Sequence, residues 1–286
     1  MAPPPQSLDH LILFLPLNPI TTLPQIPSSL TSSFTLTPGG HHADGATSNT
    51  LILLADGCYI ELISFCNPSL AEGHWWGPDA NFTGWKDWCL TNTLPANESQ
   101  KLVAGSHADP IRGGRQRPDG VKVEWDVTFP HGDRGGQGSR GRLPFFCHDV
   151  TPREVRVPVD AEKTTHACGA LGVKEINVIV DGFELFPDTC DEYVKILGEP
   201  ESKEKGLRFR LDRVKKVEGV DFGGAEVVLR YPGNEEHRKL VAKTGSWFGD
   251  VVLFGKAGPG KEQGLRERLD TAEGEDGVGG LWIEYV

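Results

Sequence analysis

The sequence predicts an α+β fold, rich in antiparallel strand, in which two similar units flank an inserted middle region. Three observations support this fold class. Short apolar runs of strand length recur along the 286 residues and outnumber the helical patterns. An Asp-Gly dipeptide at residues 56–57 separates two such runs, which is a strong hairpin signal. Both units open with a strand that carries an ionisable residue and close with a strand that carries a glutamate.

The first unit is predicted to span residues 1–70. Its first strand is the apolar run LDHLILFL, residues 8–15. The connector that follows contains several prolines and is a poor helix, because proline lacks a backbone donor and clashes with the preceding turn. Residues 49–55 and 58–65 then form the two strands of the predicted hairpin.

The second unit is predicted to span residues 166–286. It opens with the strand VKEINVIV and continues into FPDTCDEYVKILG, whose apolar residues recur at helical spacing. That helix is expected to end at Gly198, because glycine is common just beyond the last turn of a helix. Several further strand-like runs follow, and the last is GLWIEYV.

The middle region, residues 71–165, differs in composition from both units. It contains several tryptophans, a stretch rich in glycine and arginine, and short strand-like pieces. We therefore expect a β-rich and loop-rich insertion. Because it joins the end of the first unit to the start of the second, both of its ends are expected to lie beside a site that the two units share.

Each unit carries a glutamate in an apolar strand. Glu61 lies within CYIELISF, and Glu284 occupies a similar place in LWIEYV. A buried carboxylate is costly unless it is paired or binds a metal. When the opening strands of the two units are aligned, His10 falls on Glu175. If the two units pack into one curved sheet, the side chains of His10, Glu61, Glu175 and Glu284 would meet on its concave side and form a divalent-metal site. The alternative, in which each glutamate reaches solvent or an arginine, stays open.

The composition limits the class of partner. The net charge of −11 and the pI of about 5.3 argue against a protein that binds the phosphate backbone of nucleic acids. No apolar run approaches the ~18 residues of a membrane span, and residues 1–10 do not resemble a signal peptide. The six cysteines include no C-x-x-C pair. We expect a soluble, cytoplasmic protein that binds a small molecule, and neither nucleic acid nor a membrane.

Five stretches follow, in order, the pattern of a known family: LDHLIL, GGHHADGATSNTLILLADGCYIELISF, RQRPDGVKVEWDV, LPFF and HACGALGVKEINVIV. On these the chain resembles the glyoxalase-like domain proteins of the vicinal oxygen chelate superfamily, over most of residues 8–182. The resemblance implies paired βαβββ modules that form a curved, mainly antiparallel sheet cup. In the superfamily this cup usually holds a divalent metal that chelates two neighbouring oxygens of the substrate.

The resemblance also indicates metal ligands. His10 is similar to the family's first-strand ligand, and Glu61 is similar to the glutamate of its fourth strand. Glu284 is in the corresponding place of the second unit. We therefore expect His10, Glu61 and Glu284 to bind a divalent cation.

Three further residues are predicted to be catalytic. Glu175 stands at the start of the second unit, where the superfamily often has a histidine. His166 matches a histidine that the family usually places just before that strand. The stretch FFCHDVTPRE departs from the simplest form of the pattern and adds His148, next to Asp149. We expect His148, His166 and Glu175 to provide acid–base groups.

Two polar residues are predicted to contact the substrate. Arg115 and Arg117 lie beside a turn in RQRPDG, where an arginine can bind a carboxylate through two parallel hydrogen bonds, and Arg117 is the expected contact. The alternative is that Arg117 pairs with Asp119 and fixes the turn. His42 follows His41 after a Gly-Gly turn, and at most one of these neighbours faces a site if the chain is extended. The alternative is that both His41 and His42 are exposed loop residues that contact no substrate.

The tryptophans of the middle region form a second group of predicted contacts. Trp85, Trp88 and Trp125 lie in short strand-like pieces. Such residues belong either to a core or to the wall of a pocket. We expect Trp85, Trp88 and Trp125 to line the substrate pocket, which would suit an aromatic or polyketide-like molecule.

The leading functional hypothesis is an enzyme of isomerase or lyase type that acts on a small organic molecule. A divalent metal would polarise a carbonyl or stabilise an enolate, and a carboxylate or histidine would move the proton. Two alternatives stay open. One is a metal-free protein that binds or sequesters a small molecule, and the other is a metal-free enzyme that uses a pocket histidine.

Overall fold

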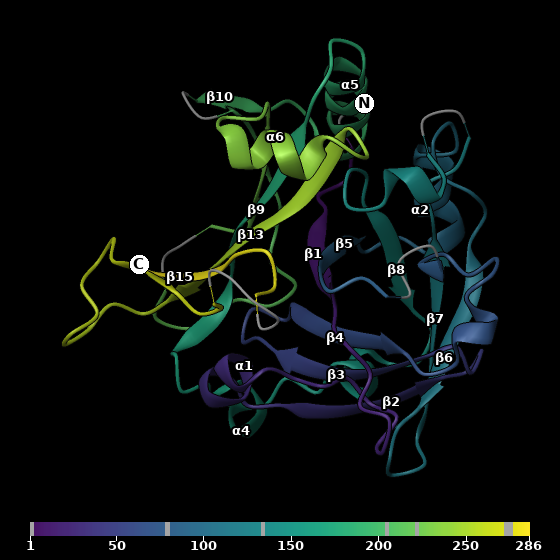
Figure 1. Ribbon diagram of the computed structural model, residues 1–286, viewed down its shortest axis with the longest axis vertical. Helices are drawn as coiled ribbons and strands as arrows, with labels where there is room; N and C mark the ends of the chain where they lie inside the picture. The colour runs from purple at the N-terminus through teal and green to yellow at the C-terminus, as the bar shows by residue number, and fades with distance from the viewer. Residues whose placement is uncertain (1–2, 78–80, 133–134, 204–205, 221–222, 272–276) are drawn as a thin grey trace.

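The computed structural model describes residues 3–77, 81–132, 135–203, 206–220, 223–271 and 277–286. The chain folds into two β-sheets accompanied by short helices (Figure 1). The first sheet is a closed barrel of eight strands in the order β1-β4-β3-β2-β6-β7-β8-β5. The second sheet has seven strands in the order β10-β11-β12-β9-β13-β15-β14. The predicted α+β fold class is confirmed.

The barrel strands are β1 (Ser7–Phe14), β2 (Thr37–His42), β3 (Thr47–Leu53), β4 (Tyr59–Phe65), β5 (Gly84–Thr91), β6 (Ile111–Gln116), β7 (Lys122–Thr128) and β8 (Phe145–Asp149). The strands of the second sheet are β9 (Ala170–Val180), β10 (Glu201–Lys203), β11 (Gly206–Arg210), β12 (Glu226–Arg230), β13 (Ser246–Gly255), β14 (Arg266–Arg268) and β15 (Leu281–Tyr285). The helices are α1 (Ser28–Ser33), α2 (Ala96–Leu102), α3 (Arg153–Arg156), α4 (Ala161–Thr164), α5 (Leu185–Leu197) and α6 (Glu235–Val241), with 3-10 turns η1 (Pro68–Leu70) and η3 (Gln137–Ser139). Within the described ranges, no helix combines the length and the apolar character that a bilayer crossing requires.

A βαβββ unit recurs along the chain. In the first unit, α1 connects β1 to β2, and β4 returns beside β1 with parallel pairing. The same order recurs in β5-α2-β6-β7-β8, where β5 and β8 are parallel. It recurs again in β9-α5-β10-β11-β12, where β9 and β12 are parallel. The βαβββ modules and the curved, mainly antiparallel sheet that we predicted are therefore present.

The partner of the first module differs from the prediction. β1 pairs with β5 in antiparallel register, with His10 opposite Cys89, and β2 pairs with β6. The barrel is therefore closed by the middle region, which is itself a βαβββ module, and not by residues 166–286. Those residues contain the second sheet. The division of the chain into domains at residues 70 and 165 stays a prediction.

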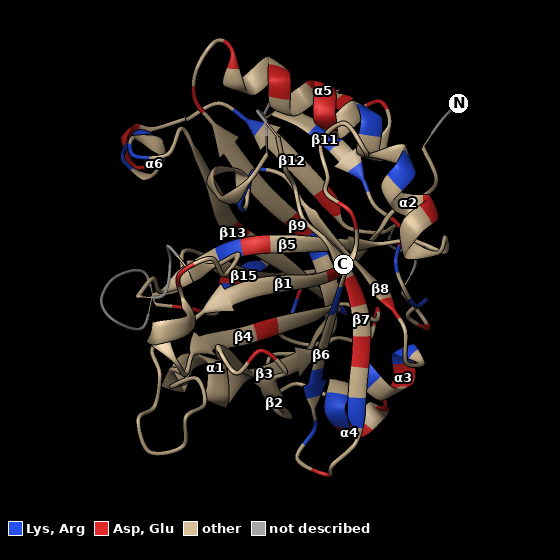
Figure 2. Ribbon diagram, turned by 90° about the vertical axis from the view of Figure 1, so that its right-hand side faces the viewer, with Lys and Arg blue, Asp and Glu red and all other residues tan. Residues whose placement is uncertain are grey.

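Alternate residues of β1 face two different cores. Leu11 and Leu13 pack in a large cluster that also contains residues of β9 and β13, and this cluster joins the barrel to the second sheet. Figure 2 shows β1 and β4 in one half of the molecule and β11, β12 and α5 in the other. Ile12 and Phe14 pack with residues of β4 and β8 inside the barrel. His10 shares their face, so its side chain also points inward.

His107, which follows α2, is a fully buried histidine beside the barrel. Its Nε2 lies 2.9 Å from the carbonyl oxygen of Pro144, and its Nδ1 lies 3.0 Å from Oγ of Ser106. Burial lowers the pKa of His107 to about 4. In an unfolded chain, a histidine has a pKa of about 6.5.

This difference predicts a loss of stability in mild acid. Between the two pKa values the unfolded chain binds a proton and the native His107 does not, so stability falls as the pH falls from about 6.5 towards 4. From pH 7 to pH 5 we expect the free energy of unfolding to decrease by about 2 kcal/mol through this group. Urea unfolding at both pH values should show a correspondingly smaller decrease in a His107→Gln variant. Equal decreases in the two proteins would contradict the prediction.

Candidate active site

A cavity of about 1300 Å³ opens inside the barrel, and we call it the cup. Strands β1 to β4 and β6 to β8 all contribute side chains to its wall. The aromatic rings of Trp125, Phe129 and Phe145 line one part of the cup. A cluster of polar side chains around Glu61 lines another part.

Glu61 lies at the centre of this polar cluster. It projects from the middle of β4, which pairs with β1 on one side and β3 on the other, and only 5% of its surface is exposed. The Nδ2 amide of Asn49 donates a hydrogen bond to Oε1 at 2.7 Å. His42 Nε2 lies 3.4 Å from the same oxygen, and His10 Nε2 lies 3.7 Å from Oε2. One carboxylate therefore faces two imidazole rings.

His10 is oriented by its neighbour Asp9. The Nδ1 atom lies 2.5 Å from Asp9 Oδ1, and the ring stacks on Tyr59 with 4.6 Å between the centroids. The pairing of β1 with β5 is irregular between Leu8 and His10, and such irregularities re-aim side chains. Because an ionised carboxylate only accepts hydrogen bonds, Nδ1 carries the proton. In the neutral ring, the lone pair of Nε2 then points towards Glu61.

Asp9 is itself held by two arginines. Its Oδ2 accepts hydrogen bonds from Arg153 at 2.6 Å and from Arg156 at 2.8 Å, and the carboxyl group is fully buried. Burial opposes the ionisation of Asp9, but the charges of Arg153 and Arg156 hold its pKa well below the usual value. Asp9 is therefore a carboxylate. It supports His10 in the way that carboxylates orient metal-binding histidines.

His42, at the end of β2, approaches Glu61 from another side. Its Nδ1 lies 2.6 Å from Thr47 Oγ1, so that Nε2 is the nitrogen that faces the carboxylate. Its ring meets the ring of Trp125 edge-on, with 6.0 Å between the centroids. The adjacent His41 instead places Nε2 3.1 Å from Oγ1 of Thr22. His42 is thus the member of the pair that joins the Glu61 cluster.

The charge of Glu61 favours a cation at this point. Burial opposes its ionisation, but the hydrogen bond and charge of His42, the charge of His10 and the hydrogen bond from Asn49 lower its pKa to about 2. The charges of the two imidazole rings exist only while the rings are protonated, and a proton then lies between each Nε2 and the carboxylate. In the neutral rings the Nε2 lone pairs face an anionic oxygen, and a cation is needed in place of those protons. A divalent ion would satisfy both imidazoles at once, and two histidines with one carboxylate are an established ligand set for such ions. The residues therefore fit a divalent metal.

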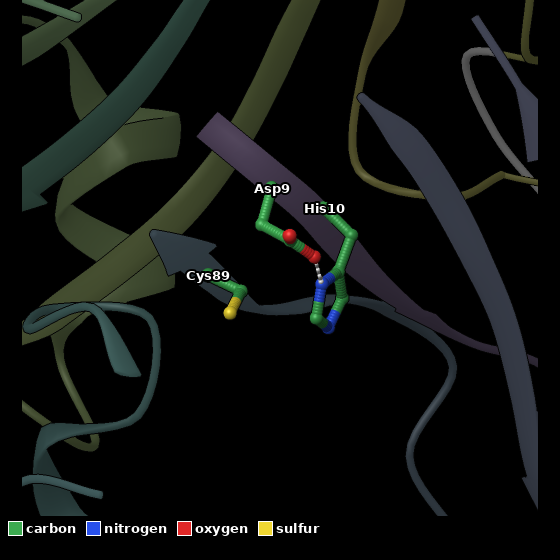
Figure 3. Close-up of side chains that lie close together, drawn as sticks. All are labelled: Asp9, His10 and Cys89. Atoms are coloured by element: carbon green, nitrogen blue, oxygen red, sulfur yellow. Dashed lines mark hydrogen bonds and ion pairs between the residues drawn. The ribbon is translucent and has the colours of Figure 1, made fainter. Parts of the chain in front are cut away.

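A second group of possible ligand atoms lies next to the first. Atoms of Asp9, His10 and Cys89 lie within 4.8 Å of one another, and Figure 3 shows the Asp9 carboxylate turned towards the His10 ring. This group is a poorer metal site, because Asp9 is already paired with Arg153 and Arg156. Burial also raises the pKa of Cys89 well above its usual value, so the sulfur is a thiol and not the thiolate that binds metals.

Two of the predicted catalytic residues do not line the cup. His148, on β8, places Nε2 3.4 Å from Asn92 Oδ1. His166 accepts a hydrogen bond at Nδ1 from the backbone of Thr35, and its Nε2 lies 2.9 Å from the carbonyl oxygen of Leu53. His166 thus ties the segment before β9 to the barrel. Their positions correct the expectation that these histidines face the substrate.

Glu175 and Glu284 belong to the second sheet. Glu175 Oε2 accepts a hydrogen bond from Arg208 at 2.8 Å, and Glu284 forms an ion pair with Lys174. Both glutamates line a separate cavity of about 510 Å³. They cannot join His10 around one ion, because the barrel is closed by β5 to β8 and not by this sheet. The predicted ligand Glu284 and the predicted catalytic group Glu175 are corrected accordingly.

Of the residues that were predicted to contact the substrate, some line the cup and others do not. Trp125 lines the cup. Trp85 lies in the core between the two sheets, where Nε1 donates to the carbonyl oxygen of Gly280 at 2.9 Å. Trp88 lies in the same core, so neither residue forms a wall of the cup. Arg117 lies at the rim of the cup, with Nη2 2.6 Å from Asp119 Oδ2. This ion pair agrees with the alternative prediction, in which Arg117 pairs with Asp119 and fixes the turn and does not bind the substrate.

Several residues of the cup were not predicted. Asn49, besides holding Glu61, accepts a hydrogen bond from Arg115. Trp75 and Trp76 line the cup, and both indole N–H groups donate to Oδ2 of a buried aspartate on β5, at 2.9 and 3.1 Å. This aspartate is Asp87, which lies between the two tryptophans of the strand GWKDWCL. A carboxylate in a strand that is otherwise largely apolar is the signal that could have identified Asp87 as a functional residue.

Comparisons with known proteins agree with this architecture. A family model for the glyoxalase-like domain matches residues 8–194, which is more than half of the chain. The search of curated proteins gives no match. Among solved structures, a hypothetical protein from Staphylococcus aureus superposes with a TM-score of 0.65 at 13% identity, covering 98% of this chain and 100% of that chain. Both sheets therefore belong to a fold that occurs in another protein.

Two further structures superpose less well. A xylose isomerase-like TIM barrel/4-hydroxyphenylpyruvate dioxygenase fusion protein has a TM-score of 0.46 at 11% identity, covering 90% of this chain and 38% of that chain. Methylmalonyl-CoA epimerase from Streptomyces coelicolor has a TM-score of 0.32 at 14% identity, covering 51% of this chain and 99% of that chain.

Proposed function

Since the chain belongs to the glyoxalase-like domain family, we propose that it is a metal-dependent enzyme of isomerase or lyase type. Its substrate is a small organic molecule that binds in the cup. One observation carries the proposal: the Glu61 carboxylate faces the Nε2 atoms of His10 and His42, at 3.7 and 3.4 Å.

In this proposal, His10, His42 and Glu61 hold a divalent ion. When bound, such an ion acts as a Lewis acid that polarises a carbonyl group or stabilises an enolate. Asp9 keeps the His10 ring in its orientation, and Asn49 holds the Glu61 carboxylate. Because these supporting contacts already exist in the protein, little reorganisation is needed when the ion binds.

We assign proton transfer to His74, which lies in the wall of the cup. The backbone N–H of Trp76 donates to Nδ1 at 3.2 Å, so in the neutral ring Nε2 carries the proton, and it lies 3.3 Å from Asp44 Oδ2. The hydrogen bond from His74 lowers the pKa of Asp44 to about 2, against the effect of burial. A histidine whose ring is oriented by a carboxylate has the arrangement of a general acid or base.

Replacement of this histidine tests the assignment. His74→Gln keeps a polar side chain but removes the titratable group, and we expect kcat to fall by about 100-fold or more while the metal content stays the same. The matched control is His41→Gln, since His41 also lines the cup but contacts Thr22. Equal kcat values for His74→Gln and the wild type would remove His74 from the mechanism.

The cluster of His10, His42 and Glu61 gives less support to the two metal-free alternatives. A protein that only sequesters a ligand has no need for an ionised carboxylate between two oriented imidazoles. A metal-free enzyme that relies on His10, His148 or His166 has less support as well. His148 and His166 do not line the cup, and His10, which does, belongs to the cluster that fits a divalent ion.

The reaction type can be tested by hydrogen exchange. Metal-loaded protein in D₂O is expected to place deuterium beside the carbonyl group of its substrate, and proton NMR of a panel of 2-oxo acids, 2-hydroxy acids and aldehydes would detect this. Removal of the metal with EDTA should stop the exchange. A panel compound that binds the metal-loaded cup but is recovered unlabelled and unchanged would contradict the proposal and favour sequestration.

A further inference from the structure

We propose that the cup selects a small organic carboxylate, and that Arg115 on β6 is the residue that binds its carboxylate group. This inference rests on the proposed function, because it concerns the substrate of the same cup. It assigns the anion-binding role to Arg115 in place of Arg117, whose guanidinium is taken up by Asp119 and the carbonyl oxygen of Val155.

Arg115 is a buried arginine with unused hydrogen-bonding capacity. Only 5% of its surface is exposed, and it contributes to the wall of the cup. Its Nη1 donates to Asn49 Oδ1 at 3.3 Å, and its Nη2 donates to the carbonyl oxygen of Arg156 at 3.0 Å. Nε has no hydrogen-bond partner among the described residues. A guanidinium offers five N–H donors, and the contacts of Nη1 and Nη2 use two of them.

The charge of Arg115 is balanced only from a distance, by Glu61 on the other side of Asn49. Among the described residues, no carboxylate forms an ion pair with it, whereas the other arginines of the cup are paired. Arg112 pairs with Asp126 at 2.7 Å, and Arg156 pairs with Asp9 at 2.8 Å. A buried and unpaired cation is costly. A ligand anion would relieve this cost, and a carboxylate matches the planar fork of a guanidinium better than other anions of one charge.

The position of Arg115 relates the anion to the metal ligands. Asn49 accepts from Arg115 through Oδ1 and donates to Glu61 through Nδ2 at 2.7 Å. A single amide group therefore separates the guanidinium from the Glu61 carboxylate. A ligand whose carboxylate lies on Arg115 would direct its neighbouring atoms towards the cluster of Glu61 and the two histidines. The rings of Trp125 and Phe145 offer an apolar surface for the rest of the molecule.

Paired probes that differ only in charge test the proposal. We would measure by calorimetry the binding of benzoate, phenylacetate and phenylpyruvate, each against its neutral amide, to the full-length protein with and without EDTA. For at least one pair, wild-type protein should bind the carboxylate at least tenfold more tightly than the amide, also without metal. Arg115→Met should abolish this preference, and Arg112→Met, which alters a paired arginine of the rim, should keep it. Arg115→Lys should retain part of the preference.

The outcomes separate this inference from the proposed function. Equal binding of every carboxylate and its amide to the wild type, or an undiminished preference in Arg115→Met, would overturn the role of Arg115. If Arg115→Met does not fold, an Arg115→Lys protein that shows the full wild-type preference for every pair would overturn the requirement for a guanidinium, and a reduced preference would support it. A preference that depends on Arg115 in a protein that never binds metal would leave this inference standing and would refute the metal-dependent function.

Discussion

Glu61→Gln is expected to weaken the binding of a divalent ion by about 100-fold or more while the protein stays folded. Glutamine has nearly the same shape as glutamate and can still accept the hydrogen bond from Asn49, but it removes the negative charge that faces His10 and His42. Loss of a group that only supports a ligand already costs 10- to 100-fold in metal affinity, so loss of a ligand should cost at least as much. Competition with a chelator of known affinity would measure the change.

Glu124→Gln provides the matched control for this experiment. Glu124 also lines the cup, but its carboxylate pairs with Lys122 at 2.8 Å, away from the histidines. We expect the affinity for the ion to be unchanged in this variant. If both glutamine variants bind the ion as the wild type does, the Glu61 cluster is not the metal site.

Arg156→Met is expected to lower the free energy of unfolding by about 3–5 kcal/mol, which is typical for breaking a buried ion pair from one side. Arg156 is almost fully buried and donates hydrogen bonds to Asp9, Asp149 and the hydroxyl group of Tyr59. Its removal leaves Asp9 with less compensation for its buried charge, although Arg153 still contacts it. Because Asp9 orients His10, the affinity for the ion should fall as well.

The control for this loss of stability is Arg112→Met. Arg112 makes a hydrogen bond of 2.7 Å to Asp126, but it is exposed, and exposed ion pairs contribute little to stability. Chemical denaturation should therefore place Arg112→Met close to the wild type and Arg156→Met far below it. Similar unfolding midpoints for the two variants would show that the buried network contributes no more than a surface pair.

The inward faces of β1 and β4 could be predicted from the sequence. Side chains alternate along a strand, so the apolar run around His10 places it with Ile12 and Phe14, and that around Glu61 places it with Ile63. Both polar residues lie in the cup, as this geometry requires. The resemblance to glyoxalase-like proteins pointed to the same two residues.

The closure of the barrel by the middle region could not be predicted in this way. The sequence of β6, IRGGRQ, has no alternation of apolar and polar residues and resembles a loop. Its glycines serve packing: a Cβ atom at Gly113 would lie only 2.5 Å from Nε1 of Trp125. Without this strand the module from β5 to β8 is not apparent, and the last part of the chain is mistaken for the partner of the first module. That error led to the prediction that Glu284 binds a metal in the cup, whereas Glu284 lines the separate cavity of the second sheet.

The contacts that support the site depend on residues that are far apart in the chain. Arg156 reaches Asp9 across 147 positions, and Arg115 reaches Asn49 across 66. No local pattern encodes such contacts, because they follow from the order of strands in the barrel. The sequence therefore indicated two of the proposed metal ligands and placed Arg115 and Arg117 beside one turn. It did not identify the residues that orient the ligands, or which arginine is the one we propose for the substrate anion.

The location of a bound ion tests the central proposal most directly. Crystals of the wild-type protein grown with Mn²⁺ or Zn²⁺ would be examined by anomalous diffraction at the absorption edge of the metal. We expect a single strong peak in the cup, within bonding distance of His10 Nε2, His42 Nε2 and the Glu61 carboxylate. A peak beside Asp9 and Cys89 instead, or no peak in the cup of metal-saturated protein, would contradict the proposal.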